Sequence, residues 1–188
     1  MIIGLYFLPG RATFDVVDAA VCAKVGPVDG SASCFYWQQE RILKMDLKGS
    51  KAVITGASSG IGEAIALELA ARGVCLTLTA RRGDRLEELG SRISAAGGEA
   101  PLLVVADLRQ ADDIGRIFHE SGERWGGLDI LVNNAGLGRK AGFHDGATED
   151  WQEMLDVNVL ALAVACREAL GCFDEQTGGH ILNVSSMA

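Results

Sequence analysis

The stretch KAVITGASSGIGEAIALELAARG, residues 51–73, decides the fold of this chain. Its first six residues form a short apolar run that ends in glycine, which is typical of a buried strand. Residues 61–73 are rich in alanine and leucine and end at Gly73, a pattern that predicts a helix. A strand, a glycine-rich turn and a helix in direct succession indicate the first step of a β-α unit.

The same alternation of strands and helices continues along the rest of the sequence. We predict further strands at 74–80, 101–106, 128–133 and 180–185, and further helices at 85–97, 110–124 and 149–170. The strand runs are apolar enough for burial on both faces, which is characteristic of parallel strands joined by right-handed helical crossovers. The sequence therefore predicts an α/β fold, a Rossmann-type doubly wound parallel sheet.

The first 44 residues do not share this rhythm. They show no sustained period of 2 or 3.6 and contain loop clusters such as GPVDGSAS at 26–33. We interpret 1–44 as an irregular N-terminal extension and 45–188 as the α/β domain. The apolar start MIIGLYFLP is short and has no Lys or Arg before it, unlike a secretory signal. A sharper hypothesis is that Met45 is the natural start.

Composition narrows the class of protein. The 188 residues are 48% hydrophobic and carry a formal net charge of −8, which allows one globular core and opposes binding to nucleic acid or anionic membrane. No apolar stretch is long enough to span a membrane. The five cysteines and three histidines show no metal-ligand spacing, so we predict no metal, no disulfide framework and a cytoplasmic location.

The turn TGASSGIG, residues 55–62, carries the first functional signal. Gly56, Gly60 and Gly62 would let the backbone turn tightly and approach a ligand, and free N–H groups at the helix start would face a pyrophosphate. We predict that Ser58, Ser59 and Ile61 of this turn also contact the cofactor. The alternative is a loop that merely packs the helix against the strand.

The same letters permit a different class of enzyme. Gly56-Ala57-Ser58-Ser59-Gly60 also satisfies G-x-S-x-G, the nucleophile elbow of α/β-hydrolases, in which Ser58 would be the nucleophile. Against this hypothesis, the motif follows the first strand, the sequence has no HGGG-type loop, and an elbow leaves Gly62 unexplained.

The end of the second predicted strand bears on the choice of cofactor. A carboxylate is expected there when the ligand is NAD, but the sequence reads Ala80-Arg81-Arg82. The guanidinium groups of Arg81 and Arg82 offer paired donors to a 2′-phosphate, which favours NADP (NADPH) and makes NAD less suitable. The alternative is that both are solvated charges that open a loop.

Three further motifs follow TGASSGIG in order: ADL at 106–108, NNAG at 133–136 and NVSS at 183–186. Together they resemble the short-chain dehydrogenase/reductase family over residues 46–188. The resemblance implies that Asp107 accepts a hydrogen bond from the adenine and that Leu108 packs beside it. It implies that the cofactor lies over Asn133, Asn134, Ala135 and Gly136. An alternative for Asp107 is an N-cap of the next helix.

The resemblance also implies two catalytic positions. Ser186 matches the serine that hydrogen-bonds the substrate, and Asn158 matches an asparagine that holds a water in a proton relay. Independently of the family, Asn158 falls within an apolar stripe of the 149–170 helix, so we expect a buried amide with hydrogen-bond partners. The alternative is a core asparagine that is satisfied by neighbouring backbone.

The family's Tyr-x-x-x-Lys pair, expected after the serine, is not in this sequence, whose only tyrosines are Tyr6 and Tyr36. One interpretation is a fragment of an NADP-dependent oxidoreductase for a small carbonyl or alcohol substrate, with a sheet incomplete at its C-terminal side. The alternative is a dinucleotide- or partner-binding module without turnover, in which the last strand would expose a hydrophobic edge. The resemblance further suggests a homo-oligomer at full length.

Overall fold

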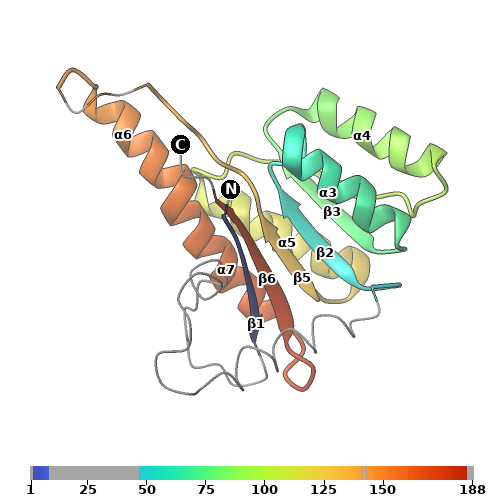
Figure 1. The fold of residues 1–188 in the computed structure, drawn as a ribbon. Coiled ribbons are helices and arrows are strands. Elements are labelled where there is room, and N and C mark those ends of the chain that lie inside the picture. Colours follow the sequence, from blue (N-terminus) through green and yellow to red (C-terminus); the bar gives the residue numbers. More distant parts are fainter. Residues whose placement is uncertain (1, 9–46, 141, 143, 186–188) are drawn as a thin grey trace, which may run out of the picture.

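The computed structural model describes residues 2–8, 47–140, 142 and 144–185, which form a sheet with helices on both faces (Figure 1). Within these residues the sheet has six strands in the order β1-β6-β5-β2-β3-β4. The strands are β1 Ile2–Leu8, β2 Lys51–Thr55, β3 Cys75–Ala80, β4 Leu102–Val105, β5 Ile130–Asn133 and β6 Gly179–Ser185. The helices are α3 Gly60–Ala71, α4 Gly83–Ala95, α5 Ala111–Trp125, α6 Thr148–Leu155, the π-helical turn η1 Asp156–Leu160 and α7 Ala161–Cys172.

Strands β2 to β6 pair only in parallel with one another, which confirms the predicted doubly wound α/β fold. From β2 the chain builds outward through β3 to β4, then crosses back to β5 on the other side of β2 and continues to β6. The order of the strands therefore reverses between β2 and β5. In open α/β sheets, ligands bind at the carboxyl ends of the strands at this switch point.

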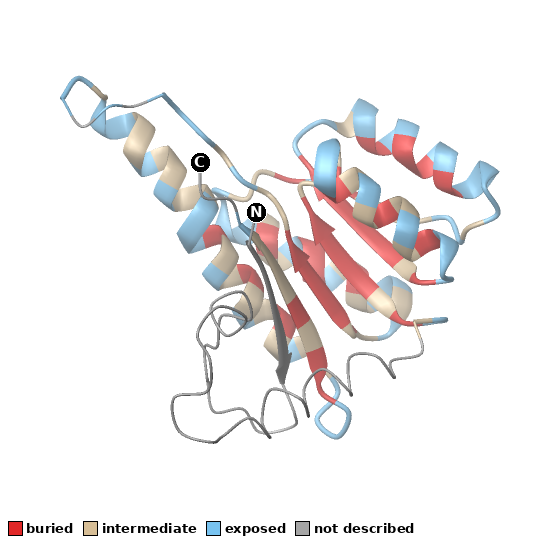
Figure 2. Cartoon of the chain, in the orientation of Figure 1, coloured by how far each residue is buried: buried red, intermediate tan, exposed pale blue. Residues whose placement is uncertain are grey.

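Two apolar layers hold the helices to the sheet, and Figure 2 shows the buried strands between them. Successive side chains of a strand point to opposite faces, so Ala52 and Ile54 pack toward α3 and α4, while Val53 packs toward α5 and α7. Burial on both faces explains why the strands read as continuous apolar runs. Among the described residues, no helix is both long and apolar enough to cross a bilayer.

The helical stretch predicted at 149–170 contains a local change of winding. It begins at Thr148, passes through the π-helical turn η1 and ends at Cys172. A π turn adds a residue to the helical repeat and rotates the following side chains relative to the preceding ones. The apolar stripe that the sequence suggested is broken here, because Leu155 is exposed while Ala161 and Ala165 are buried.

The N-terminus differs from the expected irregular structure. Residues 2–8 form strand β1, which pairs antiparallel with β6 from Ile2 opposite Ser185 to Leu8 opposite Gly179. The β6 edge that was expected to be exposed is therefore covered. The physical reason is that an edge strand offers unpaired N–H and C=O groups, which a second extended segment can satisfy. Residues 9–46 lie outside the described part of the chain, so the division at residue 45 stays a prediction.

Candidate functional site

A cavity of about 640 Å³ opens at the carboxyl ends of β2, β3, β4 and β5, at the switch point of the sheet. This volume is in the usual range for small-molecule sites. The residues that line it are Gly56, Ser58, Ser59, Ile61, Ala80, Arg81, Arg82, Ala106, Asp107, Leu108, Asn134, Ala135, Gly136, Leu137 and Val157. Eleven of the predicted cofactor residues therefore meet in one place.

The two remaining predicted glycines, Gly60 and Gly62, belong to the same turn but are not among the lining residues. Gly60 has φ +63° and Gly56 has φ +65°, a region that residues with side chains rarely adopt. A Cβ on Gly62 would lie 2.5 Å from the Gly56 carbonyl oxygen, and one on Gly56 would lie 2.7 Å from the Cα of Ala135. The turn thus closes against the loop after β5, and only glycine fits at these contacts.

A threonine that the sequence analysis did not single out joins these two loops. The buried Thr55 Oγ1 accepts the N–H groups of Asn134 at 3.0 Å and Ala135 at 3.1 Å, and it donates to the Val132 carbonyl at 3.3 Å. The Asn134 amide in turn donates to the carbonyls of Thr55 and Gly56, each at 3.1 Å. The sequence signal that could have identified Thr55 is a hydroxyl residue at the end of a strand, immediately before the first glycine of the turn.

The two asparagines of NNAG have different neighbours. Asn133 is 5% exposed, and its amide donates to Asn183 Oδ1 at 2.9 Å and contacts the Cys166 sulfur at 3.3 Å. Burial raises the pKa of the Cys166 thiol. Asn134 lines the cavity, but its amide is directed to the glycine turn. The Asn133 amide therefore connects β5 to β6 and α7, and the Asn134 amide connects the loop after β5 to the glycine turn.

The two arginines after β3 lie at the rim beside the glycine turn. Arg82 Nη2 donates to Ser58 Oγ at 3.0 Å and to Ser59 Oγ at 2.9 Å, and Arg81 is an exposed lining residue. The alternative from the sequence was that both arginines are solvated charges at the start of a loop. Arg82 is exposed, but it is hydrogen-bonded to both serines. The hydrolase hypothesis for Ser58 finds no support here, because a guanidinium does not act as a base in proteins.

Asp107 lines the cavity just after β4, the strand that pairs with β3. Its carboxylate accepts the Arg109 Nε at 3.0 Å and the Arg109 backbone N–H at 3.1 Å. This hydrogen bonding by the Arg109 side chain, helped by the charge of Arg81, lowers the pKa of the Asp107 carboxyl. The alternative that Asp107 caps the next helix is wrong, because α5 begins at Ala111 with Gln110 as its N-cap.

Asn158 lies in η1 and is exposed, so the expectation of a buried amide was wrong. The π turn carries it out of the apolar stripe. The expected partners are present, since Asn158 Oδ1 accepts the Leu137 N–H and Asn158 Nδ2 donates to the Leu137 carbonyl, both at 2.8 Å. The Asn158 amide is thus satisfied by neighbouring backbone, as the alternative proposed, but at the surface and not in the core. Its partner Leu137 lines the cavity.

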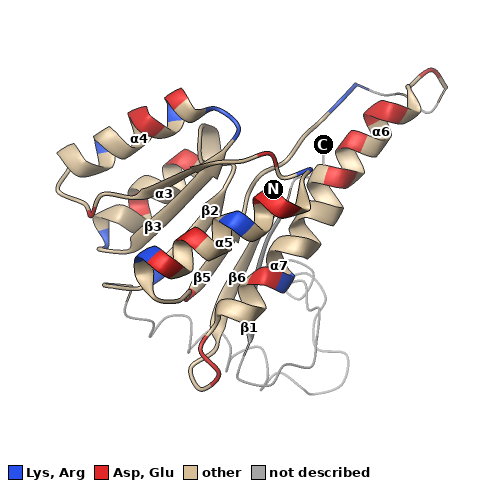
Figure 3. Ribbon diagram, turned by 180° about the vertical axis from the view of Figure 1, so that it is seen from behind, with Lys and Arg blue, Asp and Glu red and all other residues tan. Residues whose placement is uncertain are grey.

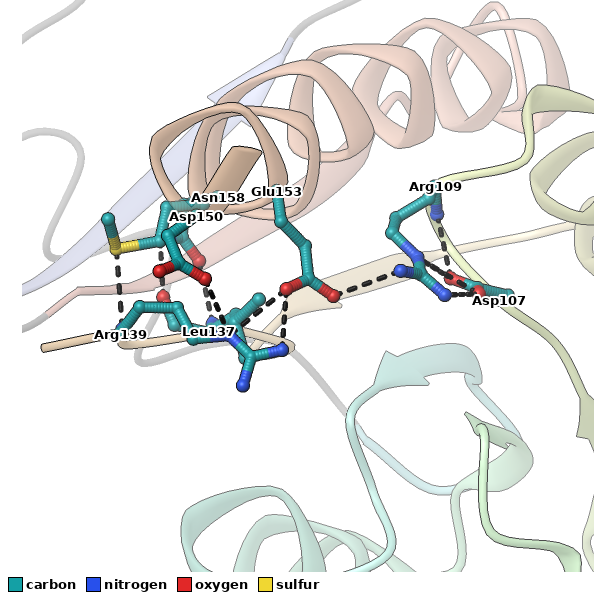
Figure 4. A network of polar contacts seen from close by, with 8 residues as sticks. Asp107, Arg109, Leu137, Arg139, Asp150, Glu153 and Asn158 are labelled. Atoms are coloured by element: carbon teal, nitrogen blue, oxygen red, sulfur yellow. Dashed lines mark hydrogen bonds and ion pairs between the residues drawn. The ribbon is translucent and has the colours of Figure 1, made fainter. Parts of the chain in front are cut away.

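The predicted catalytic Ser186 lies outside the described residues. β6 ends at the exposed Ser185, and its Asn183 reaches toward β5 through the bond to Asn133. Three further charged residues, Arg109, Arg139 and Glu153, were not found from sequence although they form a network beside the cavity (Figure 4). No motif marks them, because their contacts join a loop to a helix.

Comparison with known proteins agrees with this geometry. Residues 50–188 match the family model of the short chain dehydrogenases. The chain is 40% identical over 139 residues to dehydrogenase/reductase SDR family member 11 of Bos taurus, covering 72% of this chain and 54% of that protein. It is 35% identical over 144 residues to an oxidoreductase of Staphylococcus saprophyticus, covering 77% of this chain and 62% of that protein. The chain spans between half and two thirds of these relatives' lengths.

Solved structures point to the same family. A metagenomic short-chain oxidoreductase in complex with NADP superposes with a TM-score of 0.72 at 36% identity, covering 77% of this chain and 65% of that one. An alcohol dehydrogenase of Thermococcus sibiricus complexed with 5-hydroxy-NADP gives a TM-score of 0.63 at 36% identity, with 65% and 52% covered. The motifs, the doubly wound sheet and these matches together establish that the chain belongs to the short-chain dehydrogenase/reductase family.

Proposed function

We propose that this chain forms the NADP-binding part of an oxidoreductase that moves a hydride between the nicotinamide and a carbonyl or alcohol carbon. The observation that carries the proposal is the 640 Å³ cavity at the switch point, with a glycine turn on one side and two arginines at its rim. The site fits a dinucleotide because the cavity lies at the carboxyl ends of the strands, where the glycine turn leads directly into the N-terminus of α3.

Each part of the cavity has a role in this proposal. The turn before α3 and the free N–H groups at the start of that helix bind the pyrophosphate. Asp107 and Leu108 hold the adenine, and the loop of Asn134, Ala135 and Gly136 lies beneath the rest of the cofactor. When bound, NADP supplies the hydride chemistry, while the protein residues bind and orient it.

The preference for NADP over NAD rests on the end of β3. Arg81 and Arg82 stand where an NAD-binding site would have a carboxylate, and both line the cavity. A guanidinium matches the geometry and charge of a 2′-phosphate. Two of the solved structures similar to this chain are complexes with NADP or 5-hydroxy-NADP, which supports the same choice.

We assign the handling of the proton to Ser186 and Asn158 together with a tyrosine and a lysine of the family, which these 188 residues do not provide. Ser186 binds the substrate oxygen, and Asn158, held by the backbone of Leu137, positions a water. No residue pair in the 188 residues provides the tyrosine and lysine of the family. A phenol has a pKa of about 10 unless a nearby cation lowers it. We therefore expect residues 1–188 to bind NADPH without turning over a carbonyl substrate.

A titration of purified residues 1–188 with NADPH and NADH, followed by nucleotide fluorescence, tests the proposal. We expect NADPH to bind at least about tenfold more tightly, since charge-assisted hydrogen bonds to a phosphate are worth roughly 1.5–3 kcal/mol. Replacing Arg81 and Arg82 by Gln should remove most of this preference. Arg72→Gln, an exposed arginine paired with Glu68 on α3, is the control and should leave it unchanged. Equal affinities in the wild type would refute the NADP assignment.

The surface of α6 and η1 supports a proposal about assembly. Leu155, Val159 and Leu160 are 61%, 57% and 58% exposed and lie within one turn and a half of helix. We assign this patch to contact with a second copy of the chain in a homo-oligomer. The described cysteines Cys75, Cys166 and Cys172 are free thiols, which suits the cytoplasmic location that we propose. Sedimentation of the wild type and of Leu160→Glu tests the assembly.

A further inference from the structure

A continuous chain of charged side chains runs from the end of β4 across α6 to the loop after β5 (Figure 4). Asp107 pairs with Arg109, Arg109 pairs with Glu153, and Glu153 pairs with Arg139. The first of these residues lines the cavity on one side, and Leu137, two residues before Arg139, lines it on another. The network therefore connects two separate parts of the cavity wall.

Glu153 is the centre of this chain. Its Oε1 accepts Arg109 Nη1 at 2.9 Å, and its Oε2 accepts Arg139 Nη2 at 2.6 Å and Nε at 3.0 Å. Its side chain is 18% exposed, whereas those of Arg109 and Arg139 are 38% and 46% exposed. Both carboxylate oxygens are thus committed, each to an arginine from a different loop. Arg139 hydrogen bonding lowers the pKa of Glu153 below its usual range.

Arg109 is shared between two carboxylates. Its Nε lies 3.0 Å from each oxygen of Asp107, while its Nη1 turns to Glu153. The guanidinium is planar and rigid, so fixing one edge on Glu153 fixes the direction from which the other edge meets Asp107. Glu153 therefore sets the orientation of the Asp107 carboxylate without touching it.

The loop after β5 is attached to the α6–η1 stretch by several side-chain contacts. Arg139 binds Glu153 and forms a longer ion pair with Asp150, Nε to Oδ1 at 3.9 Å. The Arg139 backbone N–H lies 3.4 Å from the Met154 sulfur, and Leu137 is bound at both backbone groups by Asn158. Residues 134–140 have no regular secondary structure of their own, and Gly138 to Lys140 are exposed. These side-chain contacts therefore hold the segment at the cavity. Among them, the ion pair with Glu153 is the one that also connects to Asp107.

We propose that Glu153 is a positioning residue for the cofactor cavity, which holds both Asp107 and the 137–139 segment in place through its two arginines. This rests on the proposed NADP binding at that cavity. The role is distinct from that of the cavity-lining residues, since Glu153 itself does not line the cavity. Loss of its charge releases Asp107 and the 137–139 segment at once, whereas loss of either arginine releases one of them.

The test compares Glu153→Gln with Glu149→Gln, an exposed residue on the same helix that loses the same charge. We expect Glu153→Gln to weaken NADPH binding about three- to tenfold, as for loss of two partly exposed ion pairs, and Glu149→Gln to change it less than twofold. Adenosine 2′,5′-bisphosphate should bind more weakly to Glu153→Gln and Arg109→Gln but normally to Arg139→Gln. Equal behaviour of the Glu153 and Glu149 variants would overturn the proposal.

Backbone hydrogen exchange in the cofactor-free protein provides a readout that does not depend on NADPH. In Glu153→Gln, the Arg109 and Arg139 N–H groups should both exchange faster, while the melting temperature stays close to that of Glu149→Gln. A purely structural role would lower the melting temperature and accelerate exchange throughout α6. If the wild type fails to bind NADPH, the proposed function falls, and exchange at Arg109 and Arg139 still decides the coupling.

Discussion

The two walls of the cavity are built by different forces. The first wall, the glycine turn with residues 134–135, is held by backbone contact and by hydrogen bonds to the buried Thr55. The second wall, the lining at Asp107 and Leu137, is held through Arg109, Arg139 and Glu153 by partly exposed ion pairs, and Figure 3 marks in red the acidic positions along α6. Buried contacts of the first kind contribute more and are indifferent to salt.

The largest effect should come from filling the glycine turn. Gly62→Ala places a Cβ 2.5 Å from the Gly56 carbonyl oxygen, which is backbone and cannot move aside. We expect a loss of about 3 kcal/mol in the free energy of unfolding and loss of NADPH binding. Urea unfolding and nucleotide fluorescence measure the two effects.

Gly115→Ala is the matched control for this change. Gly115 lies inside α5, and a Cβ there would meet nothing within 4 Å. Alanine in a helix interior should raise the free energy of unfolding by about 0.5–1 kcal/mol. If Gly62→Ala and Gly115→Ala had the same stability and the same affinity for NADPH, close backbone packing of the glycine turn would not be what holds the first wall.

The next largest effect should come from Thr55→Val. The change keeps the shape of the side chain but leaves the N–H groups of Asn134 and Ala135 without their acceptor. An unsatisfied polar group away from water costs about 1–3 kcal/mol, so we expect a loss of about 2 kcal/mol in the free energy of unfolding. Denaturant unfolding measures it.

Thr79→Val provides a close comparison on the neighbouring strand. Thr79 Oγ1 is buried and has no hydrogen-bond partner in the described part of the protein. Removing this hydroxyl should leave stability unchanged or raise it, since nothing is left unpaired. If Thr79→Val lowered the free energy of unfolding as much as Thr55→Val, the cost of Thr55→Val would come from the changed side-chain shape. It would then not come from the two N–H groups left without an acceptor.

The difference between the walls also explains which residues the sequence could predict. The glycines, Arg82 and Asp107 were found because motifs at strand ends of a parallel sheet must converge at one edge. The strands and helices could be predicted because apolar runs and turn residues mark them in the sequence. Thr55 was missed although it stands next to the first glycine, since a strand threonine has no distinctive pattern.

The remaining differences arise from geometry that a local pattern does not contain. Asn158 was expected to be buried because a regular 3.6-residue period was assumed through η1, and the π turn breaks that period. Glu153 looked like one acid among several on an amphipathic helix. Strand β1 depends on pairing between residues 2–8 and 179–185, a contact far apart in sequence. Only the folded chain brings such partners together.

A smaller effect is expected from acid on the ion-paired wall. Arg109 lowers the pKa of Asp107, so the stabilisation is present above the unfolded value of about 3.9 and is lost as pH falls through the lower folded value. Asp107→Asn should lower the melting temperature by about 1–3 °C at pH 7. This difference from the wild type should shrink as the pH is lowered below about 3.9. A difference that stays constant as the pH is lowered would show that the charge of Asp107 is not what stabilises.

The smallest effect is the most direct comparison of the walls, because it needs no substitution. Raising sodium chloride from about 0.05 to 0.5 M shortens the distance over which exposed charges act from roughly 14 to 4 Å. The Arg139 N–H, held beside the ion pair with Glu153, should then exchange about two- to threefold faster at constant pH. The N–H groups of Asn134 and Ala135, bound to Thr55, should keep their rates. Equal acceleration at both places would mean that the two walls open together. The segment held by Glu153 would then not open separately from the glycine turn.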